Sequence, residues 1–475
     1  MAEELETQDP ETTAETSEPA QYNPKMLFLL SCVSLVVAAM VFALRATILE
    51  DVGLEFTLDA GTVGKAAGAA FLGFAASVFV GAALCDVMGM RCLLGLAAVF
   101  HIGGTLLVVF TSNLLGIASA YTILYAGMLI VGLAHGLVEA VINPLCATLY
   151  PEDKTHKMNV LHAWWPGGMI IGGLLGYAMG SLGWECRFGM VLIPSVIYGI
   201  MVAVTKFPPT ERAAADVSTK IMWKEALQPL FIIWFFMMFL TAAMELGPGQ
   251  WVDATLSKTV GFQGILLLVY VSGLMFVLRH FAGPIAHKLS PIGLMWVSSI
   301  LAGIGLLALS AANSPFTGIL AATIWAAGVC YMWPTMLGVC SERFPKGGAL
   351  LLGLMGTAGN LSIYFVLPAM GRIYDKYTQK ALGAGADLQA LMGDVAAEVP
   401  GAAEQLEAAR TVGAPYAFRY VAGAAVILVI VFGAIWLWDK SRGGYKAERL
   451  GEDGQVESDE VDATEQGMRE ESTPL

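Results

Sequence analysis

The stretch KFPPTERAAADVSTKIMWKE, from Lys206 to Glu225, divides the apolar sequence of this chain into two sets of six long runs. A helix needs about 20 mostly apolar residues to cross the hydrocarbon core of a bilayer. Runs of this kind occur before the stretch at 26–48, 62–85, 92–110, 116–149, 158–182 and 187–206, and after it at 226–248, 261–283, 292–312, 316–341, 348–370 and 416–438. The sequence therefore predicts an all-α membrane protein with twelve transmembrane helices.

The composition excludes several other classes of protein. Hydrophobic residues make up 56% of the chain and charged residues 14%, whereas about 25% of the residues of a soluble domain are charged. The formal net charge is −13, but residues 1–25 and residues 439–475 each carry −6, so the apolar runs and their loops are almost neutral. These two acidic tails are predicted to be disordered. Without a basic patch, the sequence gives no basis for nucleic-acid binding.

Lysine and arginine in the short loops predict the orientation in the membrane. Cytoplasmic loops carry the excess of these residues. With both termini inside, the inner loops hold most of the bases, and the short outer loops hold little beyond Lys65, Arg187 and Lys258. We therefore expect both termini in the cytoplasm and the long segment 372–415 outside.

The two sets of runs repeat one another. Each fourth run ends with an aromatic residue and a proline, Tyr150-Pro151 in the first set and Phe344-Pro345 in the second. Glycines recur in the run that follows, at Gly168, Gly172, Gly176 and Gly180 and at Gly353, Gly356 and Gly359. The sequence predicts two six-helix bundles, 26–206 and 226–438, related by a pseudo-two-fold axis and joined by the inner loop 207–225. The glycine stripe serves either static helix packing or a moving interface between the bundles.

The fourth run contains the strongest candidate site, in the sequence AHGLVEAVINP. His135, Glu139 and Asn143 recur every four residues, which places them on one face of a helix. An ionisable side chain costs about 2.5–3.5 kcal/mol at the centre of a membrane helix, so its presence there needs a reason. Because burial disfavours the charged form of a carboxylate, Glu139 can take up and release a proton near neutral pH. We interpret Glu139 as a proton-coupling residue and expect His135 and Asn143 to bond the substrate or to tune that carboxylate. The alternative is a structural hydrogen bond inside the bundle.

Other ionisable residues in the runs allow two interpretations each. Glu245 precedes Gly247-Pro248-Gly249, which should break the seventh helix. Because broken helices often line substrate sites, Glu245 is a candidate for such a site. The alternative is a carboxylate solvated at the outer rim. Arg45, toward the outer end of the first helix, either points into a cavity or snorkels to the surface, and we favour the cavity. Arg279 and His280, near the inner end of the eighth helix, are expected to snorkel or to pair with a loop.

Aromatic and amide side chains complete the candidate substrate site. Aromatic faces suit the apolar faces of sugar rings, although Trp and Tyr also mark the membrane interface. The candidates for substrate contact are His162 and Trp165 in the fifth helix, Tyr331 and Trp333 in the tenth, and Asn360 in the eleventh. For Trp165 we favour the interface or packing, and for Trp333 the cavity.

The loop between the second and third runs reads GAALCDVMGMR. The spacing of Asp86, Gly89 and Arg91 resembles the signature loop of the major facilitator superfamily, and the chain resembles that superfamily over nearly all of 26–438. The resemblance implies that this loop is part of a gate. Asp86 lies at a helix end, where it can pair with Arg91 or a neighbouring helix in one state and release it in another.

The fourth and fifth helices resemble the fucose–galactose–hexose class of proton symporters within that superfamily. The class motif is a Glu followed four residues later by Asn-Pro, and then an Asn that opens the next helix. It matches Glu139, Asn143-Pro144 and Asn159. This likeness implies that Glu139 lies in a proton and sugar site.

The resemblance extends to the seventh helix and fails at two positions. Glu245 and Trp251 are similar to an acidic-to-Trp spacing found in many members. Ala46, beside Arg45, stands where fucose-transporting members have an Asp, and Trp165 stands where they have a polar residue.

These features predict a secondary transporter that couples a sugar or similar small polar metabolite to protons through Glu139 and Glu245. The proton gradient would drive it, with no cofactor and no metal. The sequence has no Walker A loop, no HExxH and no other catalytic motif, so we do not expect an enzyme. We expect a monomer in the lipid of the cytoplasmic (inner) membrane. A facilitator or exporter of the same fold, and a transporter-like membrane sensor, are the alternatives.

Overall fold

The computed structural model describes residues 22–56, 58, 60–215, 217–260, 264–383, 385–396, 399–451 and 455–458. Within these residues, nine helical segments are long and apolar enough to cross a membrane, and a tenth candidate is a helix pair bent by 59°. Two further helices, α6 with 25 residues and α17 with 35, are also long enough to cross a membrane. These twelve segments match the twelve predicted runs one for one.

The first half contains the helices α1 to α8. Their bounds are α1 (Pro24–Ala46), α2 (Leu49–Glu55), α3 (Ala60–Met88), α4 (Met90–Val109), α5 (Ala120–Leu149), α6 (Lys154–Ala178), α7 (Trp184–Gly189) and α8 (Leu192–Val204), with a 3-10 turn η1 (Ser112–Leu114). Helices α3 and α4 pack on α5, and α1 packs on α6. Their apolar faces bury a common core that extends from Leu27 to Val202.

The second half contains α11 to α19. Their bounds are α11 (Pro229–Val260), α12 (Gly264–His280), α13 (Ala282–Leu289), α14 (Pro291–Leu309), α15 (Pro315–Val329), α16 (Met332–Arg343), η2 (Pro345–Gly347), α17 (Gly348–Leu382), α18 (Leu388–Ala396) and α19 (Ala402–Ser441). A second core, from Met222 to Phe432, lies among them. Two short helices, α9 (Glu211–Ala214) and α10 (Thr219–Glu225), lie between the halves in sequence.

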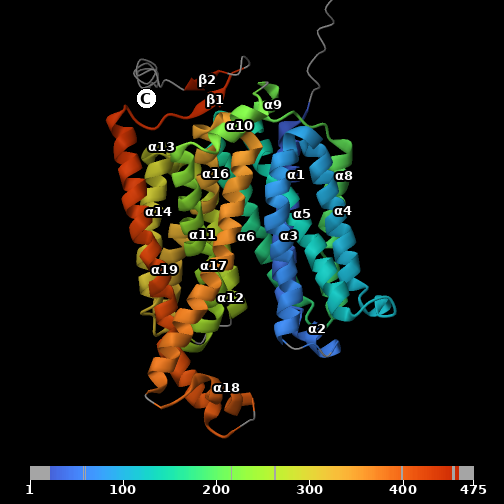
Figure 1. Ribbon diagram of the computed structural model, residues 1–475, viewed down its shortest axis with the longest axis vertical. Helices are drawn as coiled ribbons and strands as arrows, with labels where there is room; N and C mark the ends of the chain where they lie inside the picture. The colour runs from blue at the N-terminus through green and yellow to red at the C-terminus, as the bar shows by residue number, and fades with distance from the viewer. Residues whose placement is uncertain are drawn as a thin grey trace, which may run out of the picture.

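The connections lie at two opposite ends of the molecule (Figure 1). Helices α9 and α10 and the strands β1 (Glu448–Leu450) and β2 (Val456–Ser458) lie at one end, with the start of α1 and the end of α19. We call this the Asp86 end, after the residue near the last turn of α3. Helices α2 and α18 lie at the other end, which we call the α18 end.

The two halves meet through the parts of their helices nearest the Asp86 end. A Cβ on Gly353 of α17 would lie 2.1 Å from the Cβ of Ala82 in α3. A Cβ on Gly338 of α16 would lie 2.6 Å from the hydroxyl oxygen of Thr155 in α6. Such distances are shorter than any van der Waals contact, so glycine at these positions allows the helices of the two halves to close on each other here.

The glycines of the two copies lie against different neighbours. Gly168 and Gly172 face α1 of their own half and Gly176 faces Thr47 just after it, so packing within the half is the alternative present in the first copy. In the second copy, Gly353 and Gly356 face α3 of the other half.

Close packing inside the first half predicts a large effect for one glycine. A Cβ on Gly132 of α5 would lie 2.0 Å from the carbonyl oxygen of Ala70 in α3, whereas a Cβ on Gly68 would meet nothing within 4 Å. Overpacking of this kind costs about 1–3 kcal/mol. We expect Gly132→Ala to lower the thermal unfolding temperature of the purified protein and Gly68→Ala to leave it unchanged or slightly higher. Equal unfolding temperatures for the two variants would contradict the packing described here.

The predicted break at Gly247-Pro248-Gly249 is wrong, because α11 continues through it to Val260. A proline leaves the carbonyl four residues earlier without its helical donor. Here that carbonyl belongs to Met244, and the indole N–H of Trp325 donates to it at 3.1 Å. The indole of Trp325 therefore supplies the donor that Pro248 lacks, and the helix remains continuous.

Two segments predicted as irregular contain regular structure. The outer segment 372–415 consists largely of the end of α17, all of α18 and the start of α19. In the acidic segment 439–475, β1 pairs antiparallel with β2, with Arg449 opposite Glu457. Residues 1–21 and 459–475, which make up most of the two tails predicted to be disordered, lie outside the described residues.

Candidate functional site

A buried carboxylate and amide lie together on α5. The side-chain amide of Asn143 donates to a carboxylate oxygen of Glu139 at 2.8 Å and to its backbone oxygen at 2.9 Å. Glu139 is 5% exposed and Asn143 2% exposed. Their separation of four residues places both on one face of the helix, as the sequence predicts.

This pair connects to the next helix through His162. The side-chain oxygen of Asn143 lies 2.8 Å from Nε2 of His162 in α6. One turn earlier on α6, the amide of Asn159 donates to the hydroxyl of Thr335 in α16, at 3.0 Å. The fourth and fifth predicted runs thus carry a polar face that reaches from Glu139 to the second half.

Arg279 of α12 is the centre of the polar contacts on the other side. It forms an ion pair with Glu245 of α11, with 2.9 Å between Nη2 and Oε1. It also donates from Nη1 to the backbone oxygen of His162 at 2.7 Å and from Nε to that of Cys330 at 2.5 Å. Arg279 is 2% exposed, so the prediction that it snorkels or pairs with a loop is wrong.

Two prolines explain why those carbonyls are available to Arg279. Pro166 of α6 follows His162 by four residues, and Pro334 of α16 follows Cys330 by four. Each proline lacks the N–H that would bond that carbonyl. The guanidinium supplies both donors, one in each half of the molecule, and so ties α6 to the second half.

The depth of Arg279 and Glu245 follows from the shape of their helices. The eighth run does not end at His280, because α13 continues it after a bend of 59°. Arg279 therefore lies well inside the span. Because α11 continues past Pro248, Glu245 also lies well inside its helix, where the two charges meet.

Two sets of hydrogen bonds meet at His162, at the interface of the halves. Glu139 bonds to Asn143, which bonds to the ring of His162, and Arg279 bonds both to the backbone oxygen of His162 and to Glu245. The second carboxylate oxygen of Glu245 has no partner among the described residues. Charged groups of this kind are rare inside membrane helices and mark ion or substrate pathways.

His135 belongs to a different cluster. Its ring centre lies 5.1 Å from that of His101 in α4 and 5.9 Å from that of Phe74 in α3. Nδ1 of His101 lies 2.7 Å from the hydroxyl of Tyr198 in α8. Sequence reasoning missed His101. The signal that singled out Glu139, an ionisable side chain in the middle of an apolar run, is also present at His101.

The other predicted substrate residues occupy separate places. Arg45 lies over the rings of Phe42 and Phe71 and is 6% exposed, so it does not snorkel. Trp165 packs on the Phe42 ring at 6.0 Å. Trp333 lies against Gly359, where a Cβ would come within 2.2 Å of the indole ring.

Tyr331 and Asn360 bond to backbone. The Tyr331 hydroxyl donates to the backbone oxygen of Leu278 at 3.0 Å, and the Asn360 amide donates to that of Gly356 at 2.9 Å. The side chains of Ala46 and Trp251 lie outside the described residues.

A sequence model described as "Major Facilitator Superfamily" matches residues 27–378, which is most of the chain. The chain belongs to the major facilitator superfamily. No curated protein matches its sequence. The fold class predicted from the sequence is confirmed, and the protein is an integral membrane protein.

Solved structures of the superfamily share this fold at low sequence identity. FucP, the fucose:proton symporter of E. coli, in its outward conformation, superposes with a TM-score of 0.66 at 14% identity, covering 86% of this chain and 98% of FucP. The proton:xylose symporter XylE gives a TM-score of 0.66 at 14% identity, covering 86% of this chain and 95% of XylE. The human organic anion transporter MFSD10 gives 0.60 at 14% identity, covering 87% and 100%.

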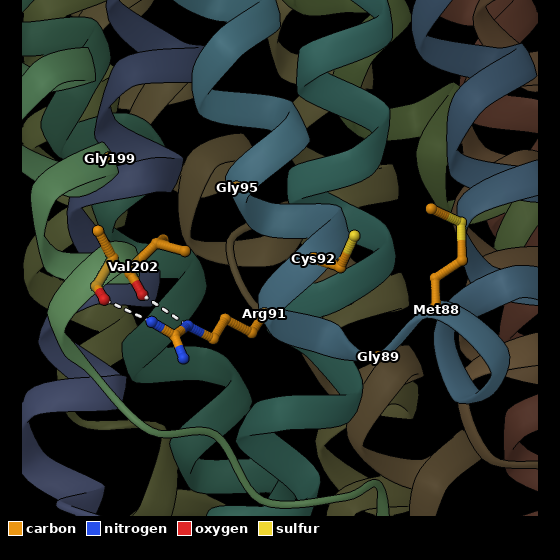
Figure 2. Close-up of a pocket in the computed structure, with 8 residues that line it drawn as sticks. Met88, Gly89, Arg91, Cys92, Gly95, Gly199 and Val202 are labelled. Carbon is orange, nitrogen blue, oxygen red and sulfur yellow. Dashed lines mark hydrogen bonds between the residues drawn. The ribbon is translucent and has the colours of Figure 1, made fainter.

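The signature loop of the superfamily forms one of the two pairings expected for Asp86. Asp86 pairs with Arg212 of α9 and accepts from the Thr210 hydroxyl, not from Arg91. Arg91 donates to the backbone oxygens of Val202, at 3.2 Å, and Ala203, at the end of α8 (Figure 2). Gly89 has φ +82°, a conformation that favours glycine, and it starts the turn into α4. The pairing of Asp86 with a neighbouring helix is the one present.

Further contacts close the Asp86 end between the halves. Lys154 of α6 forms an ion pair with Glu211 of α9 at 2.8 Å. Glu342 of α16 accepts from the backbone N–H and the hydroxyl of Thr155, at 2.9 and 2.7 Å. Both contacts involve the first turn of α6, so they lock it to the linker and to the second half.

The segment after α19 adds a strap over this closed end. The Tyr445 hydroxyl donates to Glu342 at 2.5 Å, and the backbone N–H of Leu450 donates to Glu211 at 3.0 Å. Burial, with the nearby charge of Glu342, raises the pKa of Tyr445 well above its usual value, so the hydroxyl stays protonated and donates. The strap therefore bonds to the second half and to the linker helix α9.

Removal of the strap is expected to loosen the Asp86 end. Without residues 445–475, Glu342 and Glu211 each lose a donor, whereas a chain that lacks only 459–475 keeps both. We expect several-fold faster maleimide labelling of a cysteine at the fully buried Ala349, beside this gate, in the longer truncation only. Equal labelling of the two truncations would show that the strap does not hold the end closed.

Proposed function

We propose that the protein is a secondary transporter that alternates access between its two halves and moves a small polar metabolite together with a proton. The metabolite is a sugar or a molecule of similar size and polarity. The observation that carries this proposal is the pair of buried carboxylates, Glu139 in one half and Glu245 in the other, whose hydrogen-bonded partners meet at His162. The sugar:proton symporters among the similar structures support it.

The two carboxylates divide the work of coupling. Glu139 accepts the transported proton in the first half, beside Asn143 and the ring of His162. When the same proton passes on to Glu245, it weakens the ion pair with Arg279, because a neutral acid lacks the charge that holds the guanidinium. The guanidinium then releases the carbonyl of His162, and α6 is free to move away from α12.

The Asp86 end faces the cytoplasm in this proposal. Its loops and helix ends carry Lys154, Arg212, Lys346 and Lys440, as the positive-inside rule requires. Since the contacts between the halves lie nearest this end, the chain is closed to the cytoplasm and the substrate path starts at the α18 end.

Transport in proteoliposomes tests the proposal. Purified protein reconstituted in one orientation is given a pH gradient and a panel of labelled sugars and related polar metabolites. Uphill accumulation of a solute that stops when an ionophore dissipates the gradient is the expected result. Uptake that only equilibrates the solute, with or without a gradient, would leave a facilitator and refute proton coupling.

A further inference from the structure

The guanidinium of Arg45 is buried in the first half without a carboxylate beside it. It lies 4.9 Å from the ring centre of Phe42 and 4.8 Å from that of Phe71. It donates to the backbone oxygen of Ala67 at 3.4 Å, the long limit of a hydrogen bond. A guanidinium has five N–H donors, so most of its capacity is available to another acceptor.

Other buried arginines in the described part of the chain differ in this respect. Arg279 pairs with Glu245, Arg212 with Asp86 and Arg187 with Asp51. No described acid pairs with Arg45. An uncompensated cation inside a membrane protein is destabilising, so its presence there needs a functional reason.

The polar groups around Arg45 also lack an acid. His135 of α5 lies within electrostatic reach of Arg45. Its Nε2 has no partner among the described residues, and neither has Nε2 of His101. Tyr198 bonds to the other ring nitrogen of His101. Arg45 and the cluster of His135, His101 and Tyr198 thus supply one cation, two imidazoles and a phenol, and no described acid bonds to any of them.

We infer that Arg45 binds the carboxylate of the transported metabolite, so the substrate class is a small organic acid such as a sugar acid. Arginine holds a carboxylate through two parallel N–H donors. Phe42 and Phe71 lie together against the guanidinium, and Trp165 packs on Phe42, so the apolar part of the metabolite has aromatic surfaces next to its anionic group. The inference rests on the proposed function and narrows its substrate.

The inference also determines the net charge that crosses the membrane in each transport cycle. A carboxylate at Arg45 and a proton at Glu139 together carry no net charge across the membrane. A neutral sugar with one proton would instead carry one positive charge.

Binding to the purified full-length protein tests the inference with matched probes. Glucuronate has a carboxylate where glucose has a hydroxymethyl group. Lactate likewise has a carboxylate where lactamide has a neutral amide. We expect either carboxylate to raise the unfolding temperature and to give heat in calorimetry, and its neutral partner to do neither. Arg45→Gln should weaken that binding roughly tenfold or more, because a charge-assisted bond is lost.

Two further variants separate charge from folding. Arg45→Lys retains the charge and should keep part of the binding. Arg419→Gln removes an arginine that also lies over an aromatic ring, Tyr416, in the second half, and should bind as the wild type does. Stronger binding of glucose than of glucuronate, no binding of either carboxylate, or equal binding by wild type and Arg45→Gln would each overturn the inference.

The response to membrane potential gives a second readout that needs no variant. For the probe that binds, we expect a pH gradient to drive uptake and an imposed potassium diffusion potential to have no effect. Uptake driven by an interior-negative potential alone would overturn the inference and leave proton symport intact. Absence of any response to the pH gradient would instead refute the proposed function, whatever Arg45 binds.

Discussion

Replacement of Glu139 by glutamine is expected to abolish proton-driven accumulation of solute while counterflow continues. Glutamine keeps the size of the side chain and can still bond to Asn143, but it cannot take up and release a proton. Exchange of solute for solute needs no net proton movement, so it persists. Accumulation is measured with labelled solute in proteoliposomes under an inward pH gradient, and counterflow in the same vesicles without one.

The control for Glu139→Gln is Glu404→Gln, at an exposed position in the first turn of α19. This variant should accumulate solute as the wild type does. Accumulation at the full wild-type rate in Glu139→Gln would remove the coupling role from this carboxylate. Loss of both accumulation and counterflow, with normal unfolding, would assign Glu139 to substrate binding instead.

Replacement of Arg279 by glutamine is expected to destabilise the protein strongly. The change leaves Glu245 buried without its ion partner, and it removes the donors to the two carbonyls freed by Pro166 and Pro334. Removal of one member of a buried ion pair costs about 3–5 kcal/mol. The free energy of unfolding of the purified protein should fall by an amount of this order.

A double-mutant cycle separates the ion pair from the carbonyl contacts. Glu245→Gln alone should also destabilise the protein. The double variant should lose less than the sum of the two single losses, because it leaves no unpaired charge, whereas each single variant leaves one. Arg91→Gln, at an exposed arginine, serves as the control. Strict additivity, or a loss in Arg279→Gln no larger than that of the control, would contradict the central place of this guanidinium.

Local patterns predicted much of the architecture. Twelve apolar runs and the polar stretch 206–225 define the helices, since a membrane helix needs only a length and a composition. The spacing of Glu139 and Asn143 predicted their contact, because both lie on one helix. These features depend on residues close together in the sequence.

Contacts between helices were not predictable in the same way. The pairing of Arg279 with Glu245 depends on the bend between α12 and α13 and on the continuity of α11, and each depends on neighbours distant in sequence. Pro248 looked like a break because its sequence neighbours cannot show that Trp325 bonds to the freed carbonyl. The first glycine stripe likewise could not reveal that α1, of the same half, packs against it.

Proton movement during downhill entry of the solute tests the account most directly. Proteoliposomes loaded with a pH-sensitive dye receive the identified solute from outside, with no gradient imposed beforehand. The account predicts that the interior acidifies as solute enters wild-type vesicles, and that it does not in Glu139→Gln vesicles, although solute still exchanges. Solute entry into wild-type vesicles with no change in internal pH, or equal acidification in the variant, would contradict it.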